Sequence, residues 1–157
     1  MRNATVADLN GDGKPEIIAA NRYGKTPGFN HDGKLDVVAI DEATGIAIYV
    51  GRGDGTFAAP VPIGDITIVP YALTVGDLNC DGTADFIVGD VTAPSTVYFN
   101  DGTGKNFTRV SFGDSKGTAF GGTVGDVDKD GRPDIAVARS EAPNVLYFAS
   151  GPAGRCK

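Results

Sequence analysis

Aspartates recur in short glycine-containing segments, and their spacing is the feature of the chain that points most directly to chemistry. Each segment has Asp or Asn at alternate positions, a glycine at the sixth position and an acidic residue at the ninth. A hard cation such as Ca²⁺ binds about six to eight oxygens, which a tight loop supplies from alternate side chains and a backbone carbonyl. The pattern therefore predicts a set of cation-binding loops.

Four loops of this kind can be aligned, and they differ in the charged oxygens that they offer. Gly28 stands where the second loop should begin with an aspartate, and Glu16 is one methylene longer than the aspartate that ends the other loops. Because cation affinity depends on ligand number and charge, we expect the last loop to bind best and the Gly28 loop worst; whether the Gly28 loop binds at all is left open. From the last loop to the first, the expected ligands are Asp126, Asp128, Asp130, Asp134 and the carbonyl of Arg132; Asp77, Asn79, Asp81, Asp85 and the carbonyl of Thr83; Asn30, Asp32, Asp36 and the carbonyl of Lys34; and Asp8, Asn10, Asp12, Glu16 and the carbonyl of Lys14.

Other loop types share part of this composition. Asn, Asp and Gly also dominate ordinary turns, but a turn does not require carboxylates at alternate positions, where they repel one another without a cation. An EF-hand loop needs flanking helices and an acidic ligand at position twelve, which here is Ala19, Ala39, Val88 or Val137. The cation-binding interpretation fits better than either, and Ca²⁺ is the expected ion.

The elements that carry the loops repeat at a constant interval. The loops that begin at residues 28, 77 and 126 are 49 residues apart, and Tyr49, Tyr98 and Tyr147 keep the same interval. No segment shows a sustained helical period, and a short apolar run rich in β-branched residues follows each loop, as is typical of a strand. These runs cover residues 37–40, 86–88 and 135–137. The sequence therefore predicts an all-β chain with four antiparallel strands in each repeat.

A unit of four antiparallel strands and about 40 to 50 residues is the size of one β-propeller blade. The loop motif between two strands resembles that of the FG-GAP or VCBS repeat family, which forms the calcium-binding blades of integrin α-subunit propellers and occurs in many secreted bacterial and fungal proteins. The resemblance extends from Val6 to Phe148. It implies propeller blades, bound Ca²⁺, a secreted or extracellular location, and recognition of an extracellular protein or glycan.

The first repeat is too short for a regular array. Asp8 lies 20 residues before Gly28, so about 29 residues of the expected interval are missing. We expect a single domain over residues 1–157, with a truncated repeat at about 1–27 and further repeats at 28–76, 77–125 and 126–157. Its twelve or so strands amount to about three blades, fewer than the ~4 that close a ring. The chain is then an incomplete ring, or homo-oligomerisation completes one.

Composition narrows the function classes. With 20 acidic residues against 14 basic ones and a formal charge of −6, the chain is not expected to bind nucleic acid. No apolar run approaches the ~20 residues of a membrane span, and no acid–base pair stands out beyond the loops. We therefore expect a non-catalytic calcium-binding module for extracellular recognition or adhesion. The alternatives are a calcium-dependent, lectin-like carbohydrate binder and an accessory domain of a secreted enzyme.

Three smaller features have ordinary explanations. Residues 52–54 spell Arg-Gly-Asp, the tripeptide that integrins recognise, but they belong to a glycine-rich turn of the repeat, so we do not expect adhesion through them. His31, the single histidine, lies in the weakest loop and is expected to be solvated. Cys80 and Cys156 lack the spacing of a zinc or redox site, and whether they pair is left open.

Overall fold

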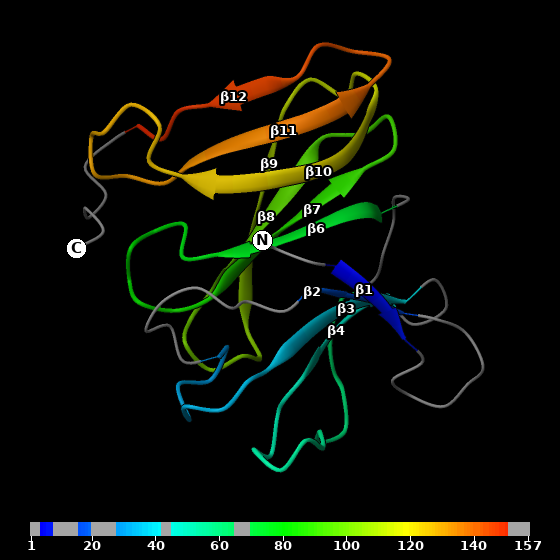
Figure 1. Ribbon diagram of the computed structural model, residues 1–157, viewed down its shortest axis with the longest axis vertical. Helices are drawn as coiled ribbons and strands as arrows, with labels where there is room; N and C mark the ends of the chain where they lie inside the picture. Colours follow the sequence, from blue (N-terminus) through cyan, green and yellow to red (C-terminus); the bar gives the residue numbers. More distant parts are fainter. Residues whose placement is uncertain (1–3, 8–15, 20–27, 42–44, 65–69, 151–157) are drawn as a thin grey trace.

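The computed structural model describes residues 4–7, 16–19, 28–41, 45–64 and 70–150. Within these ranges the chain forms twelve strands and no helix, and all strand pairs are antiparallel (Figure 1). The all-β prediction is therefore confirmed. No helix in the described part of the chain is long and apolar enough to cross a membrane.

The strands form three sheets in which neighbours along the chain are also neighbours in space. The five-stranded sheet contains β1 (Ala4–Ala7), β2 (Glu16–Ala19), β3 (Val37–Asp41), β4 (Gly45–Tyr49) and β5 (Val61–Gly64). The four-stranded sheet contains β6 (Pro70–Gly76), β7 (Asp85–Asp90), β8 (Ser95–Asn100) and β9 (Phe107–Phe112). The three-stranded sheet contains β10 (Thr118–Gly125), β11 (Asp134–Ser140) and β12 (Val145–Tyr147).

Strand register follows the sequence repeat. In the three sheets the residue after the ninth-position aspartate pairs with a tyrosine: Val37 with Tyr49, Phe86 with Tyr98, and Ile135 with Tyr147. Cross-strand pairs of β-branched or aromatic residues stabilise a sheet, and they set its register because a shift by one residue would move every side chain to the opposite face. The repeated pairs therefore hold each loop at the same place relative to its sheet.

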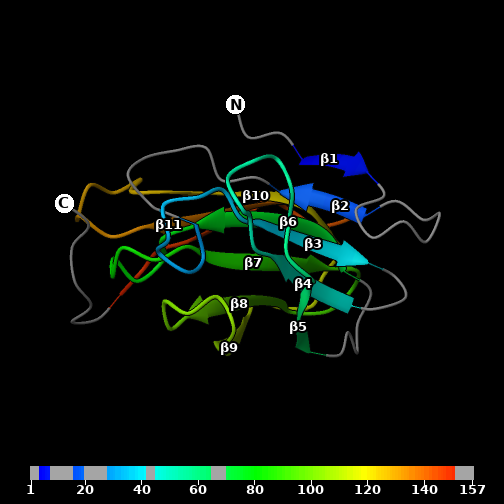
Figure 2. The same ribbon diagram turned by 90° about the horizontal axis from the view of Figure 1, so that it is seen from below.

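The sheets are stacked as layers, with the four-stranded sheet in the middle (Figure 1, Figure 2). The main core lies between the five-stranded and four-stranded sheets and includes Phe29, Ile48, Phe86 and Tyr98, all buried. The rings of Phe86 and Tyr98 stack at a centroid distance of 4.5 Å, and the ring of Phe29 meets Phe86 edge-on at 6.1 Å. Burial of these large side chains provides most of the driving force for stacking the layers.

The shortened first repeat changes the composition of the first sheet. Residues Ile17, Ile18 and Ala19 of β2 pair with residues 40, 39 and 38 of β3. In the middle sheet, residues 89, 88 and 87 of β7, which lie 49 positions later, pair with β6. Strand β2 therefore occupies beside β3 the place that β6 occupies beside β7, and β1 is added outside it. The twelve strands are consequently divided five, four and three.

Candidate metal centre

Three of the predicted loops are described in full, and they share one backbone shape. We call residues 28–36 loop I, residues 77–85 loop II and residues 126–134 loop III. The fourth residue of each loop has a left-handed backbone, with φ of 59° at His31, 62° at Cys80 and 63° at Lys129. The sixth residue of each loop is a glycine that is also left-handed, with φ between 76° and 88°. Glycine adopts this conformation without a steric penalty, so the sixth position lets the loop turn sharply.

The ninth-position aspartate anchors each loop to its sheet. Asp36, Asp85 and Asp134 are buried, with exposed fractions of 3%, 0% and 1%. One carboxylate oxygen of each accepts the N–H of the second loop residue at 2.7–2.8 Å. The other accepts the N–H of the residue fifteen positions later, at or just beyond the end of the next strand, at 2.9–3.0 Å. Because each oxygen has two lone pairs, these bonds are compatible with cation binding.

The environment of the ninth-position aspartate differs between loops II and III. Burial is the largest influence on Asp85 and raises its pKa to about 6; the carboxylates of Asp81 and Asp77 add to the rise, and its two backbone hydrogen bonds oppose it. The N–H groups of Ala149 and Val127 lower the pKa of Asp134. A cation in loop II would stabilise the ionised form of Asp85.

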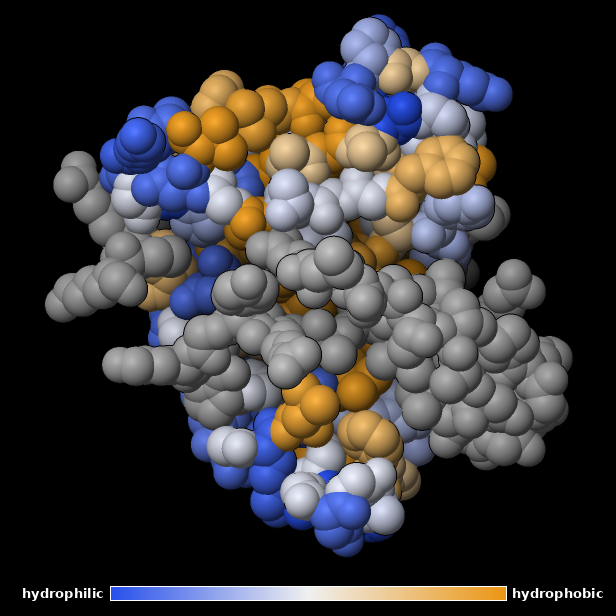
Figure 3. Space-filling model, viewed as in Figure 1, coloured by the Kyte–Doolittle hydropathy of each residue, from blue (hydrophilic) through white to orange (hydrophobic). Residues whose placement is uncertain are grey.

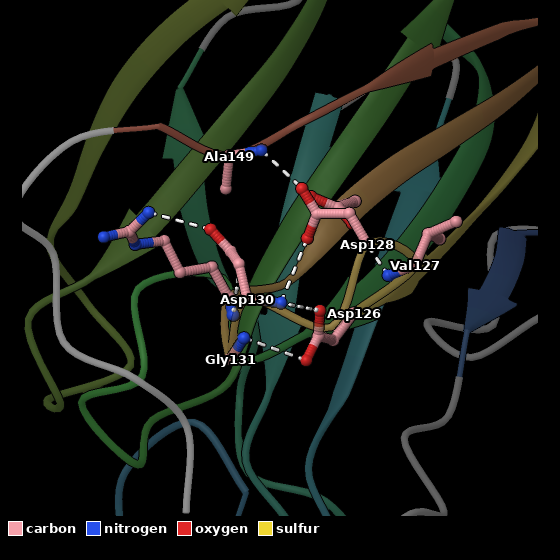
Figure 4. Close-up of polar contacts among 8 residues, drawn as sticks. Asp126, Val127, Asp128, Asp130, Gly131 and Ala149 are labelled. Atoms are coloured by element: carbon pink, nitrogen blue, oxygen red, sulfur yellow. Dashed lines mark hydrogen bonds and ion pairs between the residues drawn. The ribbon is translucent and has the colours of Figure 1, made fainter.

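Loop III brings three carboxylates together (Figure 4). Asp126, Asp128 and Asp130 each offer an oxygen, and these oxygens all lie within 4.8 Å of one another. The N–H of Asp130 donates to Asp126 at 3.0 Å and to Asp128 at 3.1 Å, and the N–H of Gly131 donates to Asp126 at 3.0 Å. The backbone therefore orients the carboxylates, and the hard oxygen donors are those that Ca²⁺ or Mg²⁺ prefers.

Loop II has the same arrangement with one charge fewer. Asp77 accepts the N–H of Gly82 through Oδ2 at 3.0 Å, as Asp126 accepts that of Gly131. The Oδ1 of Asp77 is buried and has no hydrogen-bond partner among the described residues. A buried carboxylate oxygen without a partner is unfavourable, and a bound cation would satisfy it. The residues of loop II therefore fit a cation.

Loop I departs from this pattern at its first residue. Gly28 has a φ of 38°, and a Cβ atom there would lie 2.4 Å from Oδ2 of Asp36 and 2.8 Å from the carbonyl oxygen of Lys34. The position that carries an aspartate in loops II and III therefore has no room for a side chain. Of the other predicted ligands, Asn30 and Asp32 hydrogen bond to each other.

The earliest predicted loop lies mostly outside the described residues. Asp8, Asn10, Asp12 and Lys14 belong to ranges that the structure does not describe, and Glu16 is described only as the first residue of β2, paired with Ala7.

The Arg-Gly-Asp segment, His31 and Cys80 have ordinary structural surroundings. Asp54 of the Arg-Gly-Asp segment accepts the N–H of Thr56 at 2.9 Å and its hydroxyl at 2.7 Å. Asp101 makes the same pair of bonds with Thr103, so the carboxylate of Asp54 has a turn-forming role that recurs in the next repeat. His31 is exposed, as expected. Cys80 is disulfide-bonded; the other cysteine of the sequence lies outside the described residues.

Comparison with known families agrees with the repeat and the loop geometry. The FG-GAP-like repeat matches residues 28–88 and, in an overlapping second match, residues 81–137. These matches cover more than half of the chain, so the protein belongs to the FG-GAP-like repeat family. The repeat implies propeller blades, and the three stacked sheets are consistent with blades, although they do not close into a ring. No match was found among curated proteins.

Sequence reasoning missed two buried polar residues. The amide of Asn100 donates to the carbonyl of Phe29 at 2.8 Å and to that of Ala84 at 3.2 Å, and thereby ties loop I to the middle sheet. Asp90, the last residue of β7, is fully buried, and neither of its oxygens has a hydrogen-bond partner within the described ranges. Burial raises the pKa of Asp90 to about 7. Neither residue is part of an acidic loop, so the loop motif did not mark it.

Proposed function

We propose that this chain is a calcium-binding FG-GAP module that acts in extracellular recognition rather than catalysis. The observation that carries the proposal is the convergence of three carboxylate oxygens in loop III within 4.8 Å. The buried Oδ1 of Asp77, which has no hydrogen-bond partner among the described residues, independently supports the same chemistry in loop II. The extracellular role is supported by the resemblance to integrin-type blades.

The proposed ligands are those that the loop backbone already orients. In loop III they are Asp126, Asp128 and Asp130, together with Asp134, which two backbone hydrogen bonds hold in place. Ca²⁺ would supply positive charge to a site in which like charges otherwise repel. Each loop connects two strands of one sheet, so its ligands come together only in the folded chain. Ca²⁺ that binds the folded chain and not the unfolded chain stabilises the fold by mass action.

Thermal unfolding with and without Ca²⁺ tests the proposal. At a free Ca²⁺ concentration 100-fold above Kd, one site contributes about 2.7 kcal/mol. For a chain of this size we expect the Tm in Ca²⁺ to exceed that in EDTA by about 5 °C or more. Asp126→Asn should reduce this difference, whereas Asp32→Asn, the same type of substitution at the fifth position of loop I, should leave most of it. An equal Tm in Ca²⁺ and EDTA would contradict the proposal.

A second candidate function is carbohydrate binding, and one observation favours it. Tyr71 and Phe120 lie 49 residues apart, and each is the residue at a register shift, in β6 and β10 respectively. Their rings meet edge-on at a centroid distance of 4.7 Å, yet 47% of Tyr71 and 54% of Phe120 are exposed. Bulges often re-aim side chains at binding sites, and exposed aromatic rings suit the apolar face of a sugar.

Binding of labelled chain to a glycan array separates the two candidates. A carbohydrate binder should retain specific glycans, and Tyr71→Ala or Phe120→Ala should abolish retention. Phe148→Ala is the control, because Phe148 is 55% exposed and lies outside the aromatic pair. Retention that survives both pair variants would show that this surface does not bind sugar.

A further inference from the structure

We propose that Arg132 is an internal counter-ion of loop III, which competes with the bound cation and sets the calcium affinity of this loop. The inference rests on the proposed function and names the residue that tunes it. In a calcium-binding loop of this type, the seventh residue is expected to contribute only its backbone carbonyl as a ligand. In this structure the side chain of that residue contacts the cation site directly.

The contact joins Arg132 to one of the three converging carboxylates. Nη1 of Arg132 lies 2.8 Å from Oδ2 of Asp130, and the backbone N–H of Arg132 donates to Oδ1 of the same carboxylate at 2.9 Å. Asp130 therefore has both oxygens occupied by a single residue. A cation that binds Asp130 must share its negative charge with the guanidinium or displace it.

The environment of Arg132 makes this ion pair stronger than an ordinary surface pair. The side chains of Arg132 and Asp130 are 23% and 30% exposed. The Nε of Arg132 is buried and has no hydrogen-bond partner among the described residues. A partly buried charge pair is screened less by water than an exposed pair, so its effect on a nearby cation is larger.

Loop II provides an internal comparison that lacks the guanidinium. Its seventh residue is Thr83, whose hydroxyl and N–H both donate to Asp81, the counterpart of Asp130. Thr83 therefore orients the carboxylate without adding charge. Loop III has four aspartates but also two basic residues, Lys129 and Arg132. Loop II has three aspartates and no lysine or arginine. The extra carboxylate of loop III is thus offset by residues of the same loop.

The ion pair between Arg132 and Asp130 affects the order in which the loops bind Ca²⁺. Carboxylate number alone predicts that loop III binds Ca²⁺ more tightly than loop II. With Arg132 bound to Asp130, the affinity of loop III is lower than its carboxylates indicate. Replacing Arg132 should raise it.

A calcium titration followed by ¹⁵N–¹H NMR tests this loop by loop. The N–H groups of Gly131 and Gly82 donate to Asp126 and Asp77, the first ligands of loops III and II, so each amide reports one site. We expect Arg132→Gln to lower the half-saturating Ca²⁺ concentration at Gly131 by about three- to tenfold, the range for removal of one partly buried charge. The value at Gly82 should not change, and its unchanged spectrum would also show that the variant folds.

Lys129→Gln is the matched control, because it removes one positive charge from the same loop. Lys129 is exposed, and none of the described hydrogen bonds or ion pairs joins its side chain to Asp130. We expect the control to change the value at Gly131 by less than about twofold, as for a screened surface charge. Equal effects of the two substitutions would overturn the role of Arg132 and leave the proposed function intact. If Ca²⁺ moved neither amide in any variant, the proposed function would fail as well.

Discussion

Individual aspartates in this chain have different roles because their surroundings differ. Asp32, Asp54 and Asp101 are exposed, and hydrogen bonds from neighbouring turn residues lower their pKa. Asp90 is fully buried, and desolvation raises its pKa to about 7. An unpaired buried carboxylate destabilises the fold when it is ionised.

The pH dependence of stability should reveal Asp90. Its pKa is higher in the folded chain than in the unfolded chain, where it is about 4. Between these two values the folded state holds the extra proton, so this residue makes the chain less stable as the pH rises from about 4 to about 7. Asp90→Asn cannot ionise, so we expect it to raise the Tm at pH 8 by about 3 °C or more and to change it little at pH 4. Melts in EDTA at both pH values measure this; a lower Tm for the variant at pH 8 would mean that the carboxylate has a partner.

The surroundings of Gly28 prevent an aspartate from being introduced at the first position of loop I. Gly28→Asp supplies the missing first carboxylate of loop I, but its Cβ atom would collide with Asp36. We therefore expect a loss of about 1 to 3 kcal/mol of unfolding free energy and no additional calcium site. Gly33→Asp is the control, since Gly33 is also left-handed but has open space around it. Urea unfolding measures both variants, and similar losses would show that strain alone limits position 28.

At the level of the elements, the same anchor recurs in each repeat, and Asn100 adds a connection that the other repeats lack. The N–H of Asn100 donates to the buried Asp85, at the place that Gly51 and Ala149 occupy in the neighbouring repeats. Its side-chain oxygen also accepts the N–H groups of Gly102 and Gly104, each at 3.1 Å. One side chain thus holds the turn after β8 against loop I.

Removal of this side chain should loosen the contact between two layers. Asn100→Ala leaves four backbone groups without their buried partner, so we expect a loss of about 2 to 4 kcal/mol of unfolding free energy. Amide exchange at Gly102 and Gly104 should become faster. Asn106→Ala is the control, because Asn106 is exposed and makes one side-chain bond, to Asp101. A comparable loss in the control would indicate that Asn100 acts only within its turn.

At the scale of the whole molecule, the two outer faces of the stack differ. The outer face of the five-stranded sheet has a buried cluster that includes Val37, Ala39 and Tyr49. The outer face of the three-stranded sheet forms an open hollow lined by small and apolar residues that include Thr123, Ala138 and Leu146. Hydrophobic surface is visible along the upper side of the molecule, over this sheet (Figure 3). Among the described residues, no other sheet covers it.

Comparison with the previous repeat indicates that the open face of the three-stranded sheet is suited to contact another sheet. Thr123 is the counterpart of Thr74, 49 residues earlier, whose hydroxyl donates across the layer boundary to the carbonyl of Gly122 at 3.1 Å. Because this face is open among the described residues, whereas the apolar cluster on the opposite outer face is buried, we expect two copies of the chain to pair through it as a closed dimer. Thr123→Arg should make the mass in solution that of a monomer, whereas Thr108→Arg, on exposed β9, should not. A monomeric wild-type chain at all concentrations would contradict this expectation.

Local sequence patterns were enough to predict the repeat, the strands and the shape of the loops. Alternating carboxylates, glycines that adopt left-handed conformations and β-branched runs act over a few residues, so they can be read without knowledge of the fold. Tertiary structure alone showed that β2 takes beside β3 the place that β6 takes beside β7, that Asp90 is buried without a hydrogen-bond partner among the described residues, and that Asn100 joins two layers. The tertiary structure also orients Arg132 toward Asp130 and leaves no room for a side chain at the first position of loop I. These features depend on contacts between residues brought together only when the sheets stack, and burial in that stack sets the strength of each charge and hydrogen bond.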